Sequence, residues 1–220
     1  MEYFRFDQQG EKTGSSEVKI PESKAAVGAQ PLIYPMPALL IGADVDGKPN
    51  FMTAAWCGIA CSEPPMVSVG IRHRHHTLKG IKQNMAFSVN VPSVDLVTET
   101  DYCGITSGSK ADKVAVCQFR VFYGNLGGAP LIEQCPLNLE CKVVHLLDLG
   151  SHCLVIGRVE QTYVSKDCLS EEKPDVSKIR PFIFTPFPAV EYQALGEVIA
   201  KAFTIGRELK AKEKGSSGAG

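Results

Sequence analysis

Pro49-Asn50-Phe51-Met52-Thr53-Ala54-Ala55-Trp56-Cys57-Gly58 changes character halfway along its length. It follows an Asp46-Gly47 pair, which suits the positive φ angles of a tight turn between two strands, so the stretch should begin as a strand. Its side chains then shrink to alanine and glycine around a single Trp56, which leaves peptide groups open to a flat ligand. We therefore expect a cofactor site here. The alternative is that Trp56 is an ordinary core aromatic residue.

The segments around this stretch predict a barrel of short strands. Residues 38–43 form an apolar strand that pairs with it through the Asp46-Gly47 turn. Alternating or continuous apolar patterns predict further strands at 66–71, 86–91, 137–144 and 151–162. Helical patterns cover 76–82, 94–103 after a Ser93 N-cap, and 190–208. The fold class that we predict is mainly β, with a few flanking helices.

Composition and charge limit the possible partners. The 220 residues are 44% hydrophobic with a formal net charge of -1, so the chain is long enough for a substantial core and has no basic excess for nucleic acid or membrane surfaces. It shows neither a membrane-length apolar run nor a signal-peptide layout, which predicts a cytoplasmic protein. We expect an N-terminal arm at 1–28, one domain at 29–209 and a disordered tail at 210–220.

The cysteines and histidines do not predict a metal site. The eight cysteines include no Cys-x-x-Cys pair, and several lie in apolar runs, so most should be buried, reduced thiols. A reactive role for Cys57 or Cys61 beside a redox cofactor is the alternative. His73, His75 and His76 are metal-ligand types, but neighbouring loop residues rarely form a tetrahedral site without a distant partner.

Several motifs in order resemble the flavoredoxins and the wider flavin reductase family, whose fold is the FMN-binding split β-barrel, a Greek-key-like barrel. They extend over residues 31–207 and comprise Tyr34-Pro35-Met36-Pro37, Gly47-Lys48-Pro49-Asn50 before Thr53-Ala54-Ala55-Trp56, Phe87-Ser88-Val89-Asn90-Val91-Pro92, Asp101-Tyr102-Cys103-Gly104, Ser107-Gly108 before Asp112-Lys113, and Asp148-Leu149-Gly150-Ser151-His152. The long N-terminal arm and the histidine cluster depart from this pattern.

The resemblance implies an FMN site. Its expected cofactor-binding residues are Asn50, Thr53, Ala54, Ala55, Trp56, Cys57, Thr77, Ser88, Asn90, Lys113, His152 and Phe184. Thr77 and Lys113 would face the ribityl-phosphate end, and His152 would approach the flavin as the candidate catalytic residue. Arg72 and Arg74 are additional cations for the phosphate. From the residues alone, Lys113 is equally a solvated surface lysine and His152 a strand-end histidine.

The resemblance also implies a function. We expect an electron-transfer flavoprotein of the flavoredoxin type that works through bound FMN, as a homodimer with a redox protein partner. The alternative is an NAD(P)H-dependent flavin reductase, in which a nicotinamide would be the hydride donor. The chain has no Gly-x-Gly-x-x-Gly fingerprint, but the family does not resemble the Rossmann enzymes, so this absence does not argue against nicotinamide binding. A non-redox interaction module without flavin is the third possibility.

Overall fold

The computed structural model describes residues 20–207 and 209, and it divides the chain into two units, 1–33 and 34–220. The described part of the first unit, residues 20–33, contains no helix or strand. The boundary therefore lies five residues later than the predicted one at 28/29. Residues 210–220, where we predicted a disordered tail, lie outside the described residues, as do residues 1–19 of the predicted arm.

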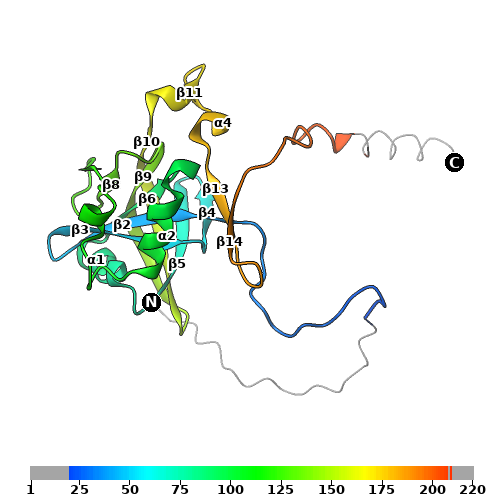
Figure 1. Ribbon diagram of the computed structural model, residues 1–220, viewed down its shortest axis with the longest axis horizontal. Helices are drawn as coiled ribbons and strands as arrows, with labels where there is room; N and C mark the ends of the chain where they lie inside the picture. The colour runs from blue at the N-terminus through cyan, green and yellow to red at the C-terminus, as the bar shows by residue number, and fades with distance from the viewer. Residues whose placement is uncertain (1–19, 208, 210–220) are drawn as a thin grey trace. The chain divides into compact units, whose positions relative to one another are not determined.

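The second unit is mainly β, as predicted (Figure 1). Its strands are β1 (Met36–Pro37), β2 (Leu39–Val45), β3 (Lys48–Ala54), β4 (Cys57–Ser62), β5 (Pro65–Arg72), β6 (Ala86–Val91), β7 (Val121–Phe122), β8 (Leu131–Ile132), β9 (Leu137–Asp148), β10 (His152–Val164), β11 (Leu169–Ser170), β12 (Lys173–Pro174), β13 (Phe182–Thr185) and β14 (Glu191–Ala194). Its helices are α1 (His76–Asn84), α2 (Val97–Ile105), α3 (Lys113–Val116) and α4 (Val176–Ile179), with 3₁₀ turns η1 (Val94–Leu96) and η2 (Lys166–Cys168).

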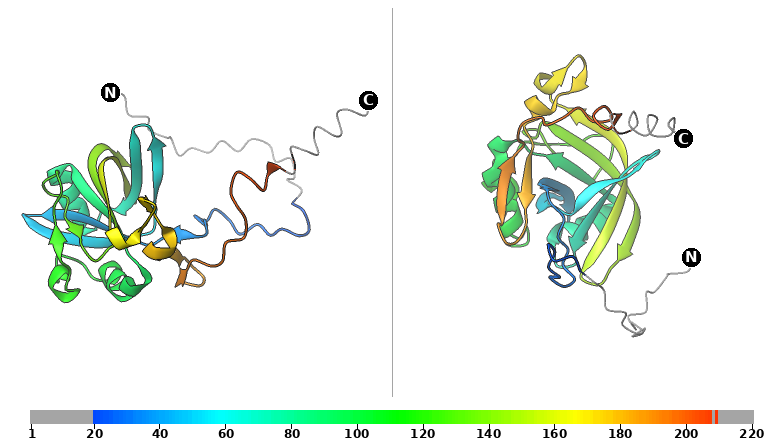
Figure 2. Two further views of the ribbon diagram at one scale, coloured as in Figure 1. Left: turned by 90° about the horizontal axis from the view of Figure 1, so that it is seen from above. Right: turned by 90° about the vertical axis from the view of Figure 1, so that its right-hand side faces the viewer.

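Seven strands form one antiparallel sheet in the order β3-β2-β6-β9-β10-β5-β4. Its two edge strands, β3 and β4, are joined by Ala55 and Trp56 alone. In a flat sheet these edges would lie roughly 29 Å apart, whereas the connection reaches at most about 11 Å. The sheet must therefore roll up until its edges approach each other, and Figure 2 shows its curved strands. Ala55 and Trp56 form the seam of this barrel, where the Gly70 N–H donates to the Trp56 carbonyl at 2.8 Å.

The hairpin that leads into the seam forms as predicted. Asp46 and Gly47 both have positive φ, 51° and 78°, and β2 pairs with β3 in register from Val45–Lys48 to Leu39–Ala54. Inward-facing apolar side chains of the rolled sheet form the main core, with Ile41, Val69 and Phe87 fully buried. A second core cluster around Phe51 and Phe119 lies under α2 and the segment from α3 to β8. The main core packs against one face of β3 and the second cluster packs against the other, so the strand is fixed on both sides.

The predicted helix over 190–208 is wrong for most of its length. Residues 191–194 form strand β14, which pairs with β13, and residues 195–200 have no regular structure. The apolar stripe on which the prediction rested is exposed, with Leu195 at 51% and both Ile199 and Phe203 above 90%. Such a stripe forms a stable helix only when another surface covers it, since propensity alone is marginal at this length. No helix within residues 20–207 and 209 is long and apolar enough to cross a membrane.

Candidate functional site

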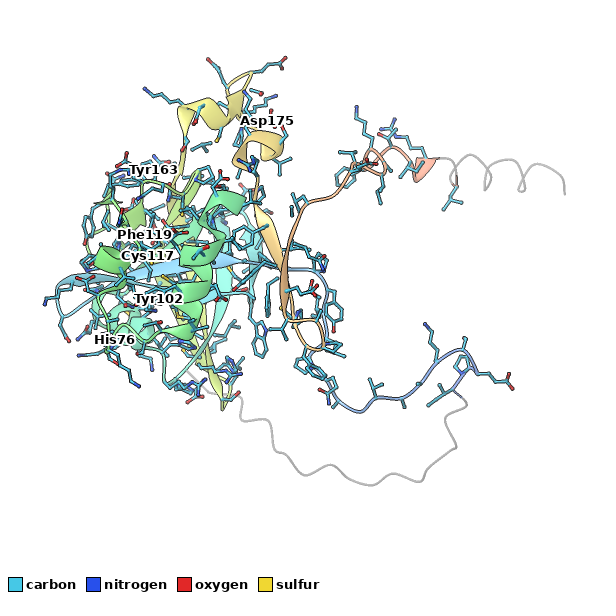
Figure 3. The ribbon with its side chains drawn as sticks, in the orientation of Figure 1. His76, Tyr102, Cys117, Phe119, Tyr163 and Asp175 are labelled. Atoms are coloured by element: carbon cyan, nitrogen blue, oxygen red, sulfur yellow. The ribbon has the colours of Figure 1, made fainter. Side chains whose placement is uncertain are left out.

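Two neighbouring cavities open beside β3, on the side of α1 and the α2–α3 loop. The larger cavity, of about 640 Å³, extends from the β2–β3 turn to the start of α3. The smaller cavity, of about 210 Å³, lies between the segment from Arg74 to Thr77 and the loop from Gly104 to Gly108. His76, Gly108 and Lys113 line both, so the two cavities share a wall. Figure 3 shows His76 in the lower part of the barrel, away from Tyr163 and Asp175.

Asn50, which lines the larger cavity, packs directly against Gly108 of the shared wall. The Asn50 side chain is 7% exposed, and its Nδ2 donates to Thr77 Oγ1 at 2.6 Å, which fastens β3 to the first turn of α1. A Cβ at position 108 would overlap Asn50 Oδ1, so only glycine allows the α2–α3 loop to approach this closely. Asn50 and Thr77, both predicted as site residues, are therefore brought together.

The N-terminus of α1 opens into the smaller cavity. His75 precedes the helix without a side-chain cap, and the first turn carries no acidic residue. The first peptide N–H groups of a helix lack partners and carry partial positive charge, so this end attracts an anion. Arg74, which is exposed, adds a full positive charge to the cavity wall. Burial and then the neighbouring Arg74 lower the pKa of His75, which favours its neutral form.

Lys113 is a buried lysine, so the surface interpretation is wrong. Its side chain is 4% exposed, and its Nζ donates to the carbonyls of Phe51 and Cys103 at 2.8 Å each. These bonds join α3 to β3 and to the last turn of α2, where a cation complements the carbonyl end of the helix. Burial lowers the pKa of Lys113. The ammonium has three donors, so one remains for the cavities that the residue lines.

Trp56 and His152 stack at the seam of the barrel. Their ring centroids lie 4.6 Å apart with an interplanar angle of 24°. Trp56 is 45% exposed, which rules out an ordinary core position. His152 lies across from Arg72 in the β5–β10 pair, and its Nδ1 is 2.7 Å from Ser151 Oγ. Partial burial, then Arg72 and His73, lower the pKa of His152 and favour its neutral form. The stack leaves an exposed aromatic surface next to the seam peptides.

The side chains of the other residues predicted at the seam point to different parts of the structure. Ala54 faces the main core, whereas Thr53 Oγ1 donates to the Thr100 carbonyl and ties β3 to α2. Ala55 is half-buried. Cys57 packs against the core, and burial raises the pKa of its thiol to about 12, which removes the thiolate needed for reaction. The cysteines from Cys57 to Cys168 are all free thiols in the structure.

Ser88 and Asn90, both predicted as site residues, lie in the interior rather than at the cavities. Both are fully buried, and Ser88 Oγ donates to the Pro130 carbonyl. Asn90 Nδ2 donates to the Leu40 carbonyl at 3.0 Å, and its Oδ1 accepts from the Ile132 N–H at 2.9 Å. Neither side chain lines either cavity, because both hold the β8 segment against the barrel.

Phe184 lies on another sheet. Its strand, β13, pairs with β1 and β14, and its ring packs against Tyr192 with centroids 5.7 Å apart. It lines neither cavity, and the same holds for the Trp56–His152 stack, which lies at the seam.

The three clustered histidines, His73, His75 and His76, lie in two different places. His73 Nε2 lies 3.2 Å from Asp148 Oδ1 and links the end of β5 to the β9–β10 turn, whereas His75 and His76 line the smaller cavity. Within residues 20–207 and 209, no three histidine, cysteine or acidic side chains converge as metal ligands. The residues that sequence analysis missed are those from Gly104 to Ser107, which line the smaller cavity, although the Ser107-Gly108 pair was a visible loop signal.

Comparisons with known proteins give consistent matches for the chain. The family model described as flavin reductase like domain matches residues 32–184. The structure is similar to a flavoredoxin from Methanosarcina acetivorans, with 38% identity, a TM-score of 0.78, and coverage of 89% of this chain and 100% of that one. It is also similar to a flavoredoxin of Desulfovibrio vulgaris, with 38% identity, a TM-score of 0.77, and coverage of 83% and 99%. An uncharacterized protein from Archaeoglobus fulgidus is 32% identical over 66% of this chain and 81% of its own length.

Proposed function

Because the chain belongs to the flavin reductase like domain family, we propose that it is an FMN-binding flavoprotein that transfers electrons through its bound flavin. The observation that carries the proposal is the smaller cavity, in which the uncapped start of α1 and Arg74 lie close to the strand β3 that leads into the seam. An anionic end and a flat body of the same ligand would each find a complementary surface there.

The described residues fit FMN part by part. The phosphate dianion suits the N-terminus of α1, where backbone N–H groups, Arg74 and the Thr77 hydroxyl supply donors without a competing carboxylate. Lys113 holds β3 and α2 in position, and its ammonium has one donor left beside the cavities that it lines. Trp56 and His152 offer an aromatic wall for the ring beside the seam.

FMN supplies the redox chemistry when bound, and the protein supplies position and electrostatics. The buried cation at Lys113 stabilises negative charge that develops on a nearby ligand, since a charge in a poorly solvated site acts more strongly than in water. His152, with its lowered pKa, presents a neutral imidazole next to Ser151. It can thus accept or relay a proton at the exposed face of the seam.

The flavoredoxin-type proposal predicts that nicotinamide alone reduces the flavin slowly. We expect the purified yellow protein to keep its absorbance near 450 nm for minutes after anaerobic addition of NADH or NADPH, because a protein donor is needed. Stopped-flow absorbance measures this. Complete bleaching within seconds by either nucleotide would instead establish the NAD(P)H-dependent flavin reductase. Dithionite reduction serves as the control that the flavin is accessible.

We also propose a homodimer. The edge strand β4 carries Ile59 at 85% exposure, and the segment after β14 exposes Val198 and Phe203 above 90%. Scattered exposed apolar residues are normal, but several within one short segment favour burial against another surface, such as that of a second copy of the chain. Light scattering at micromolar concentration should give about twice the chain mass of 23.8 kDa. A monomer mass would contradict the proposal.

A further inference from the structure

Two thiols meet where the end of α2 packs near the end of α3. Cys103 lies in the last turn of α2 and is 1% exposed, whereas Cys117 directly follows α3 and is half-buried. Both pack in the second core cluster, around Phe51 and Phe119 (Figure 3). Burial raises the pKa of both thiols, and a side-chain hydrogen bond from Cys103 to Cys117 raises the pKa of the first and lowers that of the second. The two thiols are therefore direct neighbours.

The chain between these cysteines forms the wall of both cavities. Every residue from 104 to 114 lines at least one of the two cavities. Lys113 connects this segment to both cysteines, because its Nζ donates to the Cys103 carbonyl at 2.8 Å and its own carbonyl accepts from the Cys117 N–H at 3.0 Å. A covalent bond between the two sulfur atoms would thus fix the segment at its base.

Cys117 is the thiol that a small oxidant can reach. It is half-buried and follows Val116, which is 58% exposed, whereas Cys103 is enclosed. The charge of Lys113 lowers the pKa of both thiols and so partly offsets the effect of burial. Glu99 lies one turn before Cys103 on α2, and its buried Oε2 has no hydrogen-bond partner in the described part of the chain. This carboxylate oxygen can accept the proton that a thiol loses.

We propose that Cys103 and Cys117 form a reversible disulfide that fixes the α2–α3 loop, with hydrogen peroxide as the oxidant and a dithiol as the reductant. The Cys117 thiolate attacks one peroxide oxygen, the O–O bond breaks, and the other oxygen takes up a proton and leaves as water. Cys103 then attacks the sulfur of the resulting sulfenic acid, and the S–O oxygen leaves with the Cys103 proton as a second water. Two thiols lose two electrons in total, and the peroxide gains them.

The bridge should slow the exchange of a ligand in the smaller cavity. The residues from Gly104 to Gly108 line this cavity, so a ligand that leaves past them needs the loop to move. A bond between the two ends of the segment removes part of that freedom. This effect on FMN rests on the proposed function, whereas formation of the bridge does not depend on the flavin.

Peptide mapping of the full-length protein tests the bridge directly. The purified protein is treated with hydrogen peroxide, its remaining thiols are blocked, and it is digested with trypsin. Cleavage after Lys110 and Lys113 separates the two cysteines into the peptides 83–110 and 114–120, each with one cysteine. We expect the loss of two thiols per chain and a disulfide-linked pair of these peptides, which dithiothreitol separates. The closed loop should also raise the melting temperature by about 5 °C or more.

Cys117→Ser and Cys61→Ser form a matched pair of variants, because each removes one half-buried thiol. Cys117→Ser should form no bridge and show no rise in melting temperature, whereas Cys61→Ser, on β4, should behave as the unaltered protein. Three results would overturn the proposal: an unchanged thiol count, a bridge from Cys103 to Cys135 of the same cluster, or a sulfinic acid at Cys117 without a bridge.

The rate of FMN release tests the effect on the cavity. We expect release from the oxidised protein to be at least threefold slower than from the reduced protein, with no difference between the two treatments in Cys117→Ser. Equal rates in the bridged and reduced protein would contradict control of the cavity by the bridge. A protein that forms the bridge but holds no flavin would contradict the proposed function and leave the bridge established.

Discussion

Alanine at position 108 should weaken FMN binding at least tenfold. Its Cβ would overlap Asn50 Oδ1, so the Asn50 side chain must move and its bond to Thr77 Oγ1 is lost. The wall shared by the two cavities then shifts, and the first turn of α1 is no longer fastened to β3. A tenfold loss of FMN affinity corresponds to about 1.4 kcal/mol of binding free energy. Loss of the buried hydrogen bond should also lower the free energy of unfolding by roughly 1 to 3 kcal/mol. Fluorescence titration with FMN and urea unfolding measure the two effects.

Gly127→Ala is the matched control for this substitution. A Cβ at position 127 meets nothing within 4 Å, so FMN affinity and stability should both stay within error of the unaltered protein. Unchanged FMN affinity in Gly108→Ala would show that the shared wall between the cavities plays no part in binding.

Lys113→Ala should weaken FMN and riboflavin binding alike, each by about ten- to a hundredfold. Sequence analysis placed Lys113 at the phosphate, which predicts a loss for FMN alone. The structure instead shows its ammonium bonded to the carbonyls of Phe51 and Cys103, so the substitution disturbs β3 and α2, which both flavins need. Two carbonyls lose a charged donor, and we expect roughly 1 to 3 kcal/mol lower stability. Titration of both variants with both flavins measures the affinities.

Lys173→Ala serves as the control for loss of one lysine, because Lys173 is exposed on β12. It should change neither affinity nor stability. If affinity falls for FMN but not for riboflavin, Lys113 contacts the phosphate, as the sequence analysis predicted. If the stability of Lys113→Ala is normal, water replaces the two backbone contacts of the ammonium.

Local signals in the sequence were sufficient for the elements around the site. The Asp46-Gly47 turn, the strand that begins near Asn50 and the helix that begins at His76 all appear where the patterns predict them. These features depend on residues close in the chain, such as turn chemistry and apolar periodicity. The barrel closure could not be derived from the residues in this way, because it depends on the strand order that places β3 and β4 at opposite edges of the sheet.

Features that depend on distant contacts were not visible in the sequence. Ser88 and Asn90 look like site residues in a strand pattern, but the direction of each side chain is set by the β8 segment some forty residues later. The burial of Lys113 depends on carbonyls from β3 and α2 that no local pattern reveals. The helical stripe over 190–208 failed for the same reason, since its periodicity does not say whether a partner surface is present.

The central claim is that this protein holds FMN. The most direct measurement is to denature the purified protein, separate the released small molecules and identify any flavin by chromatography and mass spectrometry, with uptake of added FMN measured on the refolded or flavin-free protein. We predict release of FMN at about one molecule per chain, or stoichiometric uptake where purification has removed it. Recovery of no flavin together with no uptake of FMN would contradict the claim.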